Sequence, residues 1–182
     1  IENVTVHESI VLIEALTKAA ACDEKGESLW SLSRAQERLW LMHQLDLSLA
    51  EANAGAAYNV STGIALSGPL DITSLQLALA QVIKRHESLR TVFPTQNDGS
   101  PMQRVVGYNH LDDSLVYIAL QGEQGLTGLV KDFIGQPFDL VHGPLFKALL
   151  VKADEGLDGG RKDQEHTLVL SLHHIICDEW SI

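Results

Sequence analysis

Cysteine is scarce in this sequence, and the scarcity excludes a cysteine-based metal or redox motif. The chain has 2 cysteines in 182 residues, Cys22 and Cys177. They stand too far apart for the close pairs that bind metals or exchange disulfides. We therefore expect a protein of a reducing, cytoplasmic compartment.

Positively charged residues are also few. Lys and Arg number 13 against 24 Asp and Glu, which gives a formal net charge of −11. A field of that sign repels phosphate backbones and anionic lipids. Nucleic acids and membrane surfaces are therefore not expected partners.

Long hydrophobic runs are also missing. Near the start, the longest purely apolar run, 10–13, stops at Glu14, far short of the ~18–20 residues that cross a bilayer. No basic segment followed by an apolar one forms a signal peptide. The apolar content of 45% is that of a globular domain, not a disordered tail. Because the chain begins with Ile1 and ends directly after Trp180 and Ser181, we expect a fragment of a larger protein.

The hydrophobic pattern predicts a mixed order of helices and strands, and hence an α/β layered fold. The last two strands are apolar on both faces, so they should be central in a sheet that is covered on each side. A long exposed loop, 154–165, should join them. Helices are expected over 7–21, 34–45, 71–86 and 126–133, and strands over 60–66, 89–93, 102–106, 115–120, 145–151 and 167–175.

Local signals mark where two of these helices begin and which faces they bury. Ser33 and Gln36 have the spacing of a capping box, which satisfies the free amides of a helix start. The next helix should be capped by Asp71 or Thr73. The buried faces we expect are Ala35, Leu39 and Met42 on the first helix, and Leu75, Leu79, Val82 and His86 on the second.

The densest chemistry lies at the C-terminal end, where His173 and His174 close a buried strand and Asp178 follows. Neighbouring side chains on a strand point to opposite faces, which disfavours one metal ion held by both histidines. One interpretation gives one histidine to chemistry and the other to the scaffold, with Asp178 as a cap or ion-pair partner. The alternative is two buried histidines hydrogen-bonded to the backbone.

Three segments together resemble one family. Residues 33–40 resemble the S-x-A-Q-x-R-L-W opening motif of nonribosomal peptide synthetase condensation domains, and 85–93 resemble their R-H-E-x-L-R-T-x-F segment. Residues 173–181 resemble their H-H-x-x-x-D-G-x-S motif. The resemblance covers about 29–182, with 1–28 as a linker or approach segment. Further landmarks are 58–60, 68–71, 137–139 and 143–146.

The resemblance implies a chloramphenicol-acetyltransferase-like two-layer α/β sandwich. This chain would be its N-terminal lobe only, with the C-terminal lobe absent. In the family the substrate tunnel runs between the lobes, so the fragment alone is expected to be inactive.

The resemblance also implies a reaction and its residues. The amine of an acceptor aminoacyl thioester attacks a donor acyl or peptidyl thioester and forms an amide bond. His174 would be catalytic, His173 and Asp178 would support the motif, and Arg38, Arg85 and Arg90 would be structural. No cofactor or metal is expected in the domain itself. Phosphopantetheine would arrive on upstream and downstream carrier proteins, next to other synthetase domains.

One position departs from the family pattern. Glu179 stands where the family usually has glycine. A carboxylate suits the first turn of a helix, but near the reacting amine it favours the charged, non-nucleophilic form. We expect a subgroup that tolerates Glu179.

Other functions remain open at this point. An epimerization domain keeps the double histidine, and a coenzyme A-dependent acyltransferase of the same superfamily shares the histidine and the aspartate. A non-catalytic carrier-docking domain is the alternative that is not an enzyme. A heterocyclizing relative is disfavoured, because it replaces the histidines with aspartate.

Overall fold

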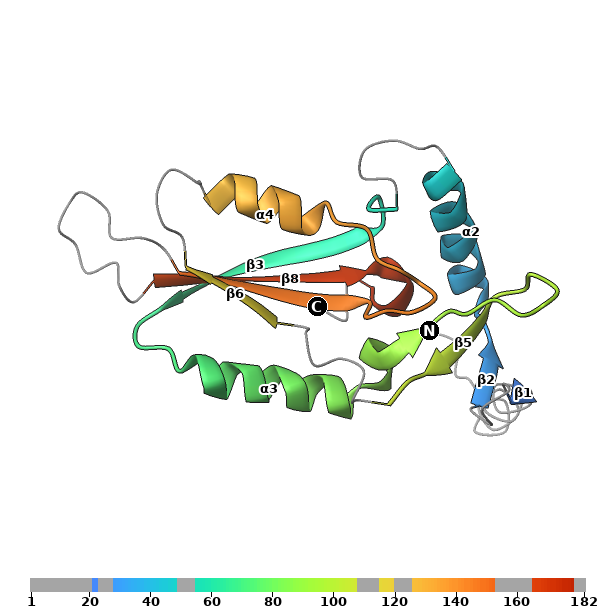
Figure 1. The fold of residues 1–182 in the computed structure, drawn as a ribbon, viewed down its shortest axis with the longest axis horizontal. Coiled ribbons are helices and arrows are strands. Elements are labelled where there is room, and N and C mark those ends of the chain that lie inside the picture. Colours follow the sequence, from blue (N-terminus) through green and yellow to red (C-terminus); the bar gives the residue numbers. More distant parts are fainter. Residues whose placement is uncertain are drawn as a thin grey trace, which may run out of the picture.

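The computed structural model describes residues 21–22, 28–48, 55–107, 115–119, 126–152 and 165–178. In this part of the chain the strands form two four-stranded sheets (Figure 1). None of the helices there is long and apolar enough to cross a membrane.

The larger sheet has its two most apolar strands in the middle. Its order is β3 (Asn59–Ser67), β8 (Glu165–His173), β7 (Phe146–Lys152) and β6 (Leu115–Ala119). β6 runs parallel to β7, and the other pairs are antiparallel. The prediction of two central strands is confirmed. The expected loop between β7 and β8 lies outside the described residues, except for Glu165, which begins β8.

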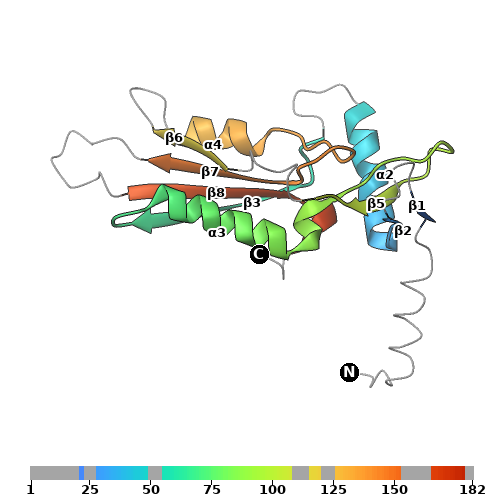
Figure 2. The same cartoon turned by 60° about the horizontal axis from the view of Figure 1, so that its bottom comes forward.

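A helix covers each face of this sheet, α3 (Ile72–Arg85) on one and α4 (Leu126–Ile134) on the other (Figures 1 and 2). On the α3 side, Ile83 of that helix packs in one apolar cluster with Leu150 of β7. On the α4 side, Phe133 packs in a second cluster with Leu149. Successive residues of β7 therefore enter opposite cores, as its continuous apolar run requires.

The smaller sheet lies at one end of the larger one, beside α2 (Arg34–Ser48) (Figure 1). The sequence pattern did not predict its first two strands. The predicted helix 7–21 lies outside the described residues, except for Ala21, which begins β1. The strand order is β1 (Ala21–Cys22), β2 (Ser28–Ser31), β5 (Met102–Val105) and β4 (Thr91–Val92).

The capping predictions for two helices are confirmed. The Ser33 amide donates to Gln36 Oε1 at 2.8 Å, and the Gln36 amide donates to Ser33 Oγ at 3.2 Å. At the start of α3, the Asp71 carboxylate accepts from the Thr73 amide at 3.0 Å. Both helices thus begin where side-chain acceptors satisfy otherwise free amides.

The predicted buried face of α2 is wrong at two of its three positions. Ala35 is exposed and Met42 is 39% exposed. Leu39 does pack against the core, together with Trp40, and His43 is the buried residue of the helix. The helix presents this face because its neighbour is the end of β8, which the spacing of α2 alone does not reveal.

The buried stripe of α3 is shifted by one residue at its C-terminal end. Val82 is 45% exposed and His86 is exposed, whereas Ile83 is 3% exposed. Leu75 and Leu79 lie on the core side as predicted. Steps of four residues, from Leu75 through Leu79 to Ile83, keep the stripe on one face.

The predicted strand 89–93 is only partly confirmed. Glu87–Arg90 form the 3₁₀ helix η1, and only Thr91–Val92 form β4. The Arg90 guanidinium donates to the carbonyl oxygens of Ile83 at 3.2 Å, Lys84 at 3.4 Å and Val106 at 2.7 Å. These bonds hold the segment against the end of α3, so the chain curls before it extends.

Candidate active site

The double-histidine segment is a sharp turn at the end of a central strand. β8 ends at His173, and His174–Ile176 form the 3₁₀ helix η3, so the predicted strand to residue 175 is two residues too long. The His173 ring Nδ1 accepts from the Ile175 amide at 3.1 Å. The His174 amide donates to the Tyr58 carbonyl at 2.9 Å. The turn is therefore held by its own side chain and by the loop before β3.

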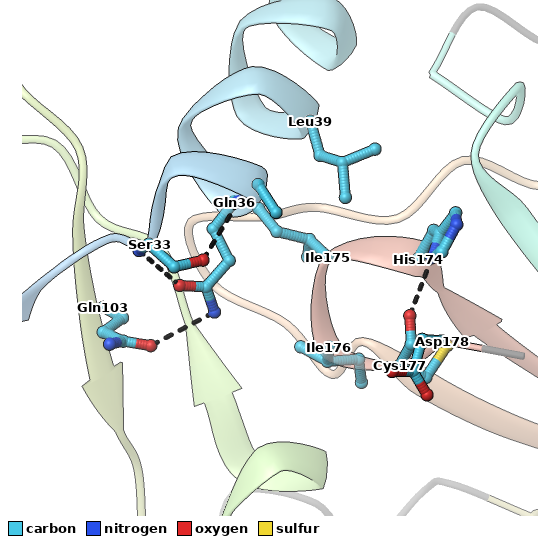
Figure 3. A pocket seen from close by; sticks show the side chains of 10 residues that line it. Ser33, Gln36, Leu39, Gln103, His174, Ile175, Ile176, Cys177 and Asp178 are labelled. Atoms are coloured by element: carbon cyan, nitrogen blue, oxygen red, sulfur yellow. Dashed lines mark hydrogen bonds between the residues drawn. The ribbon is translucent and has the colours of Figure 1, made fainter. Parts of the chain in front are cut away.

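A pocket of about 440 Å³ opens beside this turn. Figure 3 shows His174 at one end and a polar group at the other. In that group Gln36 Nε2 donates to Gln103 Oε1 at 3.3 Å. Apolar side chains separate the two ends. The lining residues are Ser33, Ala35, Gln36, Leu39, Gln103, His174, Ile175, Ile176, Cys177 and Asp178.

The protonation of the His174 ring follows from one contact. Its Nδ1 lies 2.7 Å from the main-chain carbonyl oxygen of Cys177. Because a carbonyl oxygen can only accept, Nδ1 carries the proton. In the neutral ring the lone pair is then on Nε2. His174 is half-buried and lines the pocket, so it can accept a proton there as a general base.

His173 is a buried neutral histidine with a different task. Its side chain is fully buried, and burial lowers the pKa of His173 to about 3, with smaller contributions from His43 and His174. Its Nδ1 accepts from the backbone, so the ring proton is on Nε2. The His173 ring therefore stabilises the turn by a hydrogen bond, and it is fully buried whereas His174 is half-buried.

His43 is the site residue that the sequence analysis missed. It is 1% exposed, and its ring centroid lies 5.1 Å from that of His173, with the planes at 81°. Burial lowers the pKa of His43, partly opposed by the charges of Asp46 and Asp139. The sequence signal that could have found it is its four-residue step from Leu39 on the same helix face.

Cys177 is a half-buried thiol without nucleophilic character. Its Sγ donates to the His173 carbonyl at 3.5 Å. Burial, followed by the charge of Asp178, raises the pKa of Cys177 to about 11, so the thiol is protonated at neutral pH. Asp178 is exposed and lines the pocket. Glu179 lies outside the described residues.

The three arginines lie away from the pocket. Arg90 binds three carbonyl oxygens, which fits the expected structural role. Arg38 and Arg85 are exposed. In the first turn of α2 the ion pair is made by Arg34 and Glu37 at 3.2 Å, and no ion pair of Arg38 is found among the described residues. Within the same ranges no three His, Cys, Asp or Glu side chains gather in a way that could hold a metal.

The structure has a mixed sheet with a helix on each face, and its central strand β8 is followed directly by a half-buried histidine at a pocket. These features define an α/β protein with a histidine-based site. Residues 27–182 match the family model described as the condensation domain, and the chain belongs to this family. The predicted family is thereby confirmed. Condensation domains are acyltransferase-type enzymes of nonribosomal peptide synthetases.

The relatives are large synthetases. The chain is 39% identical over 155 residues to chondramide synthase cmdD of Chondromyces crocatus, a match of 83% of this chain and 4% of that protein. It is 36% identical over 170 residues to bacitracin synthase 2 of Bacillus licheniformis, covering 93% and 6% respectively. The chain thus spans only a small part of the curated relatives it matches.

The solved structures confirm the fold class. The starter condensation domain of rhizomide synthetase RzmA superposes with a TM-score of 0.65 at 25% identity, over 84% of this chain and 34% of that one. The fold is therefore the chloramphenicol-acetyltransferase-like α/β fold of condensation domains. The chain accounts for about a third of such a domain.

Proposed function

We propose that this chain carries the catalytic histidine of a condensation domain that forms an amide bond between two carrier-bound thioesters. The observation that carries the proposal is the 2.7 Å bond from His174 Nδ1 to the Cys177 carbonyl. That bond keeps the lone pair of the neutral ring on Nε2, and His174 lines the pocket. The resemblance of 173–178 to the family motif supports the same assignment.

In the proposed reaction the α-amine of the acceptor aminoacyl thioester attacks the carbonyl carbon of the donor thioester. A C–N bond forms and the donor C–S bond breaks. The amine proton passes to His174 Nε2 and then to the departing thiolate, so the ring returns to its starting state. A histidine base contributes about 10²–10⁴ in rate, and holding two tethered reactants together contributes roughly 7–11 kcal/mol. Positioning is therefore the larger effect.

The apolar part of the pocket suits this chemistry. Leu39, Ile175 and Ile176 line the pocket beside His174. An apolar lining favours the neutral form of the amine and strengthens its hydrogen bond to the ring. His173 and Asp178 support the turn. No cofactor is bound by the chain itself in this proposal. Phosphopantetheine arms of upstream and downstream carrier proteins deliver both substrates.

A second lobe completes the site in this proposal. The chain spans 34% of a solved starter condensation domain, and its relatives are multidomain synthetases. The walls described for the pocket come from α2, β5, η3 and the residues directly after η3. The lobe alone is therefore expected to bind carriers without joining their substrates.

The test uses the chain extended through a C-terminal lobe, mixed with donor- and acceptor-loaded carrier proteins. Intact mass spectrometry of the acceptor carrier reports the condensed product. Wild type should form it and His174→Ala should lose about 10²–10⁴ in rate. His142→Ala is the control, because the His142 side chain is 80% exposed and lies in a loop.

Two outcomes would contradict the proposal. Equal rates for wild type and His174→Ala would remove His174 from the reaction. A folded wild-type protein that binds both carriers but joins no loaded pair would instead point to an epimerization or docking domain.

A further inference from the structure

Two buried imidazoles from elements far apart in the sequence meet behind the candidate catalytic turn. His43 lies on α2, and His173 ends β8. Their ring centroids are 5.1 Å apart and their planes stand at 81°, an edge-to-face contact. Both side chains are at most 1% exposed. Such a contact fixes the angle of each ring as well as its position.

The angle of the His173 ring matters because that ring builds the turn that carries His174. Its Nδ1 accepts from the Ile175 amide, and its backbone carbonyl accepts from Cys177 Sγ. The Cys177 carbonyl in turn accepts from His174 Nδ1. A tilt of the His173 ring would therefore disturb the bond that fixes the proton of His174.

The His43 ring is itself closely packed. Its Cε1 lies close to Gly55, where an added Cβ would come within 3.3 Å of it and within 3.2 Å of Pro137. Gly55 is held by its amide, which donates to Asp46 at 2.6 Å. On the other side, Phe138 and Tyr58 contact the His173 ring, each with centroids at 6.3 Å. The pair has packed neighbours on both sides and little freedom to rotate.

We propose that His43 is a positioning residue, whose ring holds the His173 ring and, through the η3 turn, the orientation of His174. The catalytic meaning of this role rests on the proposed function, whereas the effect on the His174 ring does not. His43 Nδ1 is buried without a hydrogen-bond partner among the described residues. The packing of the ring, and not a hydrogen bond from that atom, is therefore the means of positioning.

The contact requires neutral rings. The charges that face His43 are Asp46 on its own helix and Asp139 in the loop after α4, while His173 faces His43 and His174. Protonating His173 at Nδ1 would remove the acceptor of the Ile175 amide. Two imidazolium rings at this distance would also repel each other. We expect the positioning to fail in strong acid, where His173 becomes protonated.

The test compares two variants that each keep one property of the imidazole. His43→Phe keeps a ring without polar atoms, and His43→Gln keeps polar atoms without a ring. His166→Gln is the matched control, since His166 is also buried (8% exposed) with its Nδ1 unpartnered in the described part of the chain. His166 lies at the opposite end of β8 from His173.

Two readouts are needed. In the 182-residue chain, the ¹⁵N shifts of His174 report which ring nitrogen carries the proton. In the two-lobed protein with loaded carriers, kcat and KM are measured separately. We expect His43→Gln to mix the His174 tautomers and to lower kcat about 10- to 100-fold with KM unchanged, as for a misplaced catalytic group. His43→Phe and His166→Gln should retain the wild-type tautomer and most of kcat.

The outcomes separate this inference from the proposed function. A folded His43→Gln variant with the wild-type His174 tautomer overturns the inference, whatever the activity. A His43→Phe variant that is no better than His43→Gln overturns it as well. If the wild type forms no condensed product, the proposed function fails, and the tautomer comparison still decides whether His43 orients His174.

Discussion

The His174 ring donates its Nδ1 proton to the main-chain carbonyl of Cys177, three residues further along the chain, at 2.7 Å. The bond closes a small loop around η3 and joins a side chain to the main chain of the same turn. Backbone geometry thus selects the tautomer. The turn thus fixes the proton of the His174 ring on Nδ1, and the lone pair of Nε2 is available to accept a proton.

The first prediction concerns this tautomer. At a pH of about 8 the neutral His174 ring should carry its proton on Nδ1, because only that form can donate to a carbonyl. His173 should be the opposite tautomer, with its proton on Nε2, because its Nδ1 accepts from the Ile175 amide. Long-range ¹H–¹⁵N spectra of the chain labelled on histidine distinguish the two. Identical patterns for both rings would contradict the turn geometry.

The second prediction is a loss of stability in mild acid. Burial holds the pKa of His173 at about 3 in the folded chain, against an ordinary 6.5. Between these values the unfolded chain binds the extra proton, so the free energy of unfolding falls as the pH falls. The slope for this one residue is up to about 1.4 kcal/mol per pH unit. Urea unfolding from about pH 7.5 to about pH 5 measures it.

The control for this slope is His173→Asn. The amide oxygen can still accept from the Ile175 amide, but the side chain does not titrate. The variant should lose part of the pH dependence, even if its stability at pH 7 is lower. An unchanged slope would mean that His173 is not the buried titrating group.

Much of the site could be predicted from sequence because its signals are local. A continuous apolar run ends in two histidines. Such a run predicts a central strand, which brings the histidines to the end of the sheet. The Ser33–Gln36 capping box is read from four consecutive residues, and the structure has both of its hydrogen bonds.

The predictions were wrong where contacts with distant segments determine which residues are buried or how the chain turns. Val82 and Ile83 are adjacent apolar residues, and Ile83 is the buried one because it packs in the cluster with Leu150. The partner of His43 is 130 positions away, so the four-residue step from Leu39 can place His43 on the buried face but cannot reveal its contact with His173. Arg90 bends its own segment through carbonyl groups on both sides of it, and those contacts have no sequence pattern.

The third prediction concerns Arg90. Its guanidinium satisfies carbonyl oxygens at the end of α3 and after β5, with bonds of 2.7–3.4 Å. Arg90→Ala should lower the free energy of unfolding by about 2–3 kcal/mol, since it leaves these acceptors unpaired. Arg90→Lys should recover less than half, because an ammonium cannot reproduce the planar fork. Arg85→Ala should have almost no effect, because Arg85 is exposed. Equal losses in Arg85→Ala and Arg90→Ala would contradict this role.

The last prediction concerns Lys147, whose ammonium lies 4.9 Å from the Phe133 ring centroid and 4.8 Å from that of Phe138. It also donates to the Gln136 carbonyl at 3.1 Å. Burial lowers the pKa of Lys147 to about 8, while the rings and the carbonyl favour the charged form. Burial has the larger effect on the pKa, so the charge should not add net stability at neutral pH.

Lys147→Met keeps the apolar stem between the rings and removes the charge. We expect its free energy of unfolding at pH 7 to lie within about 1 kcal/mol of wild type. Lys147→Ala should be clearly less stable, because it also removes the packing. In wild type, stability should rise as the pH increases from 8 toward 10.5, since the unfolded chain keeps the lysine proton longer. That rise should be missing in Lys147→Met. Urea unfolding across this range measures it, and a rise of equal size in the variant would show that another group titrates there.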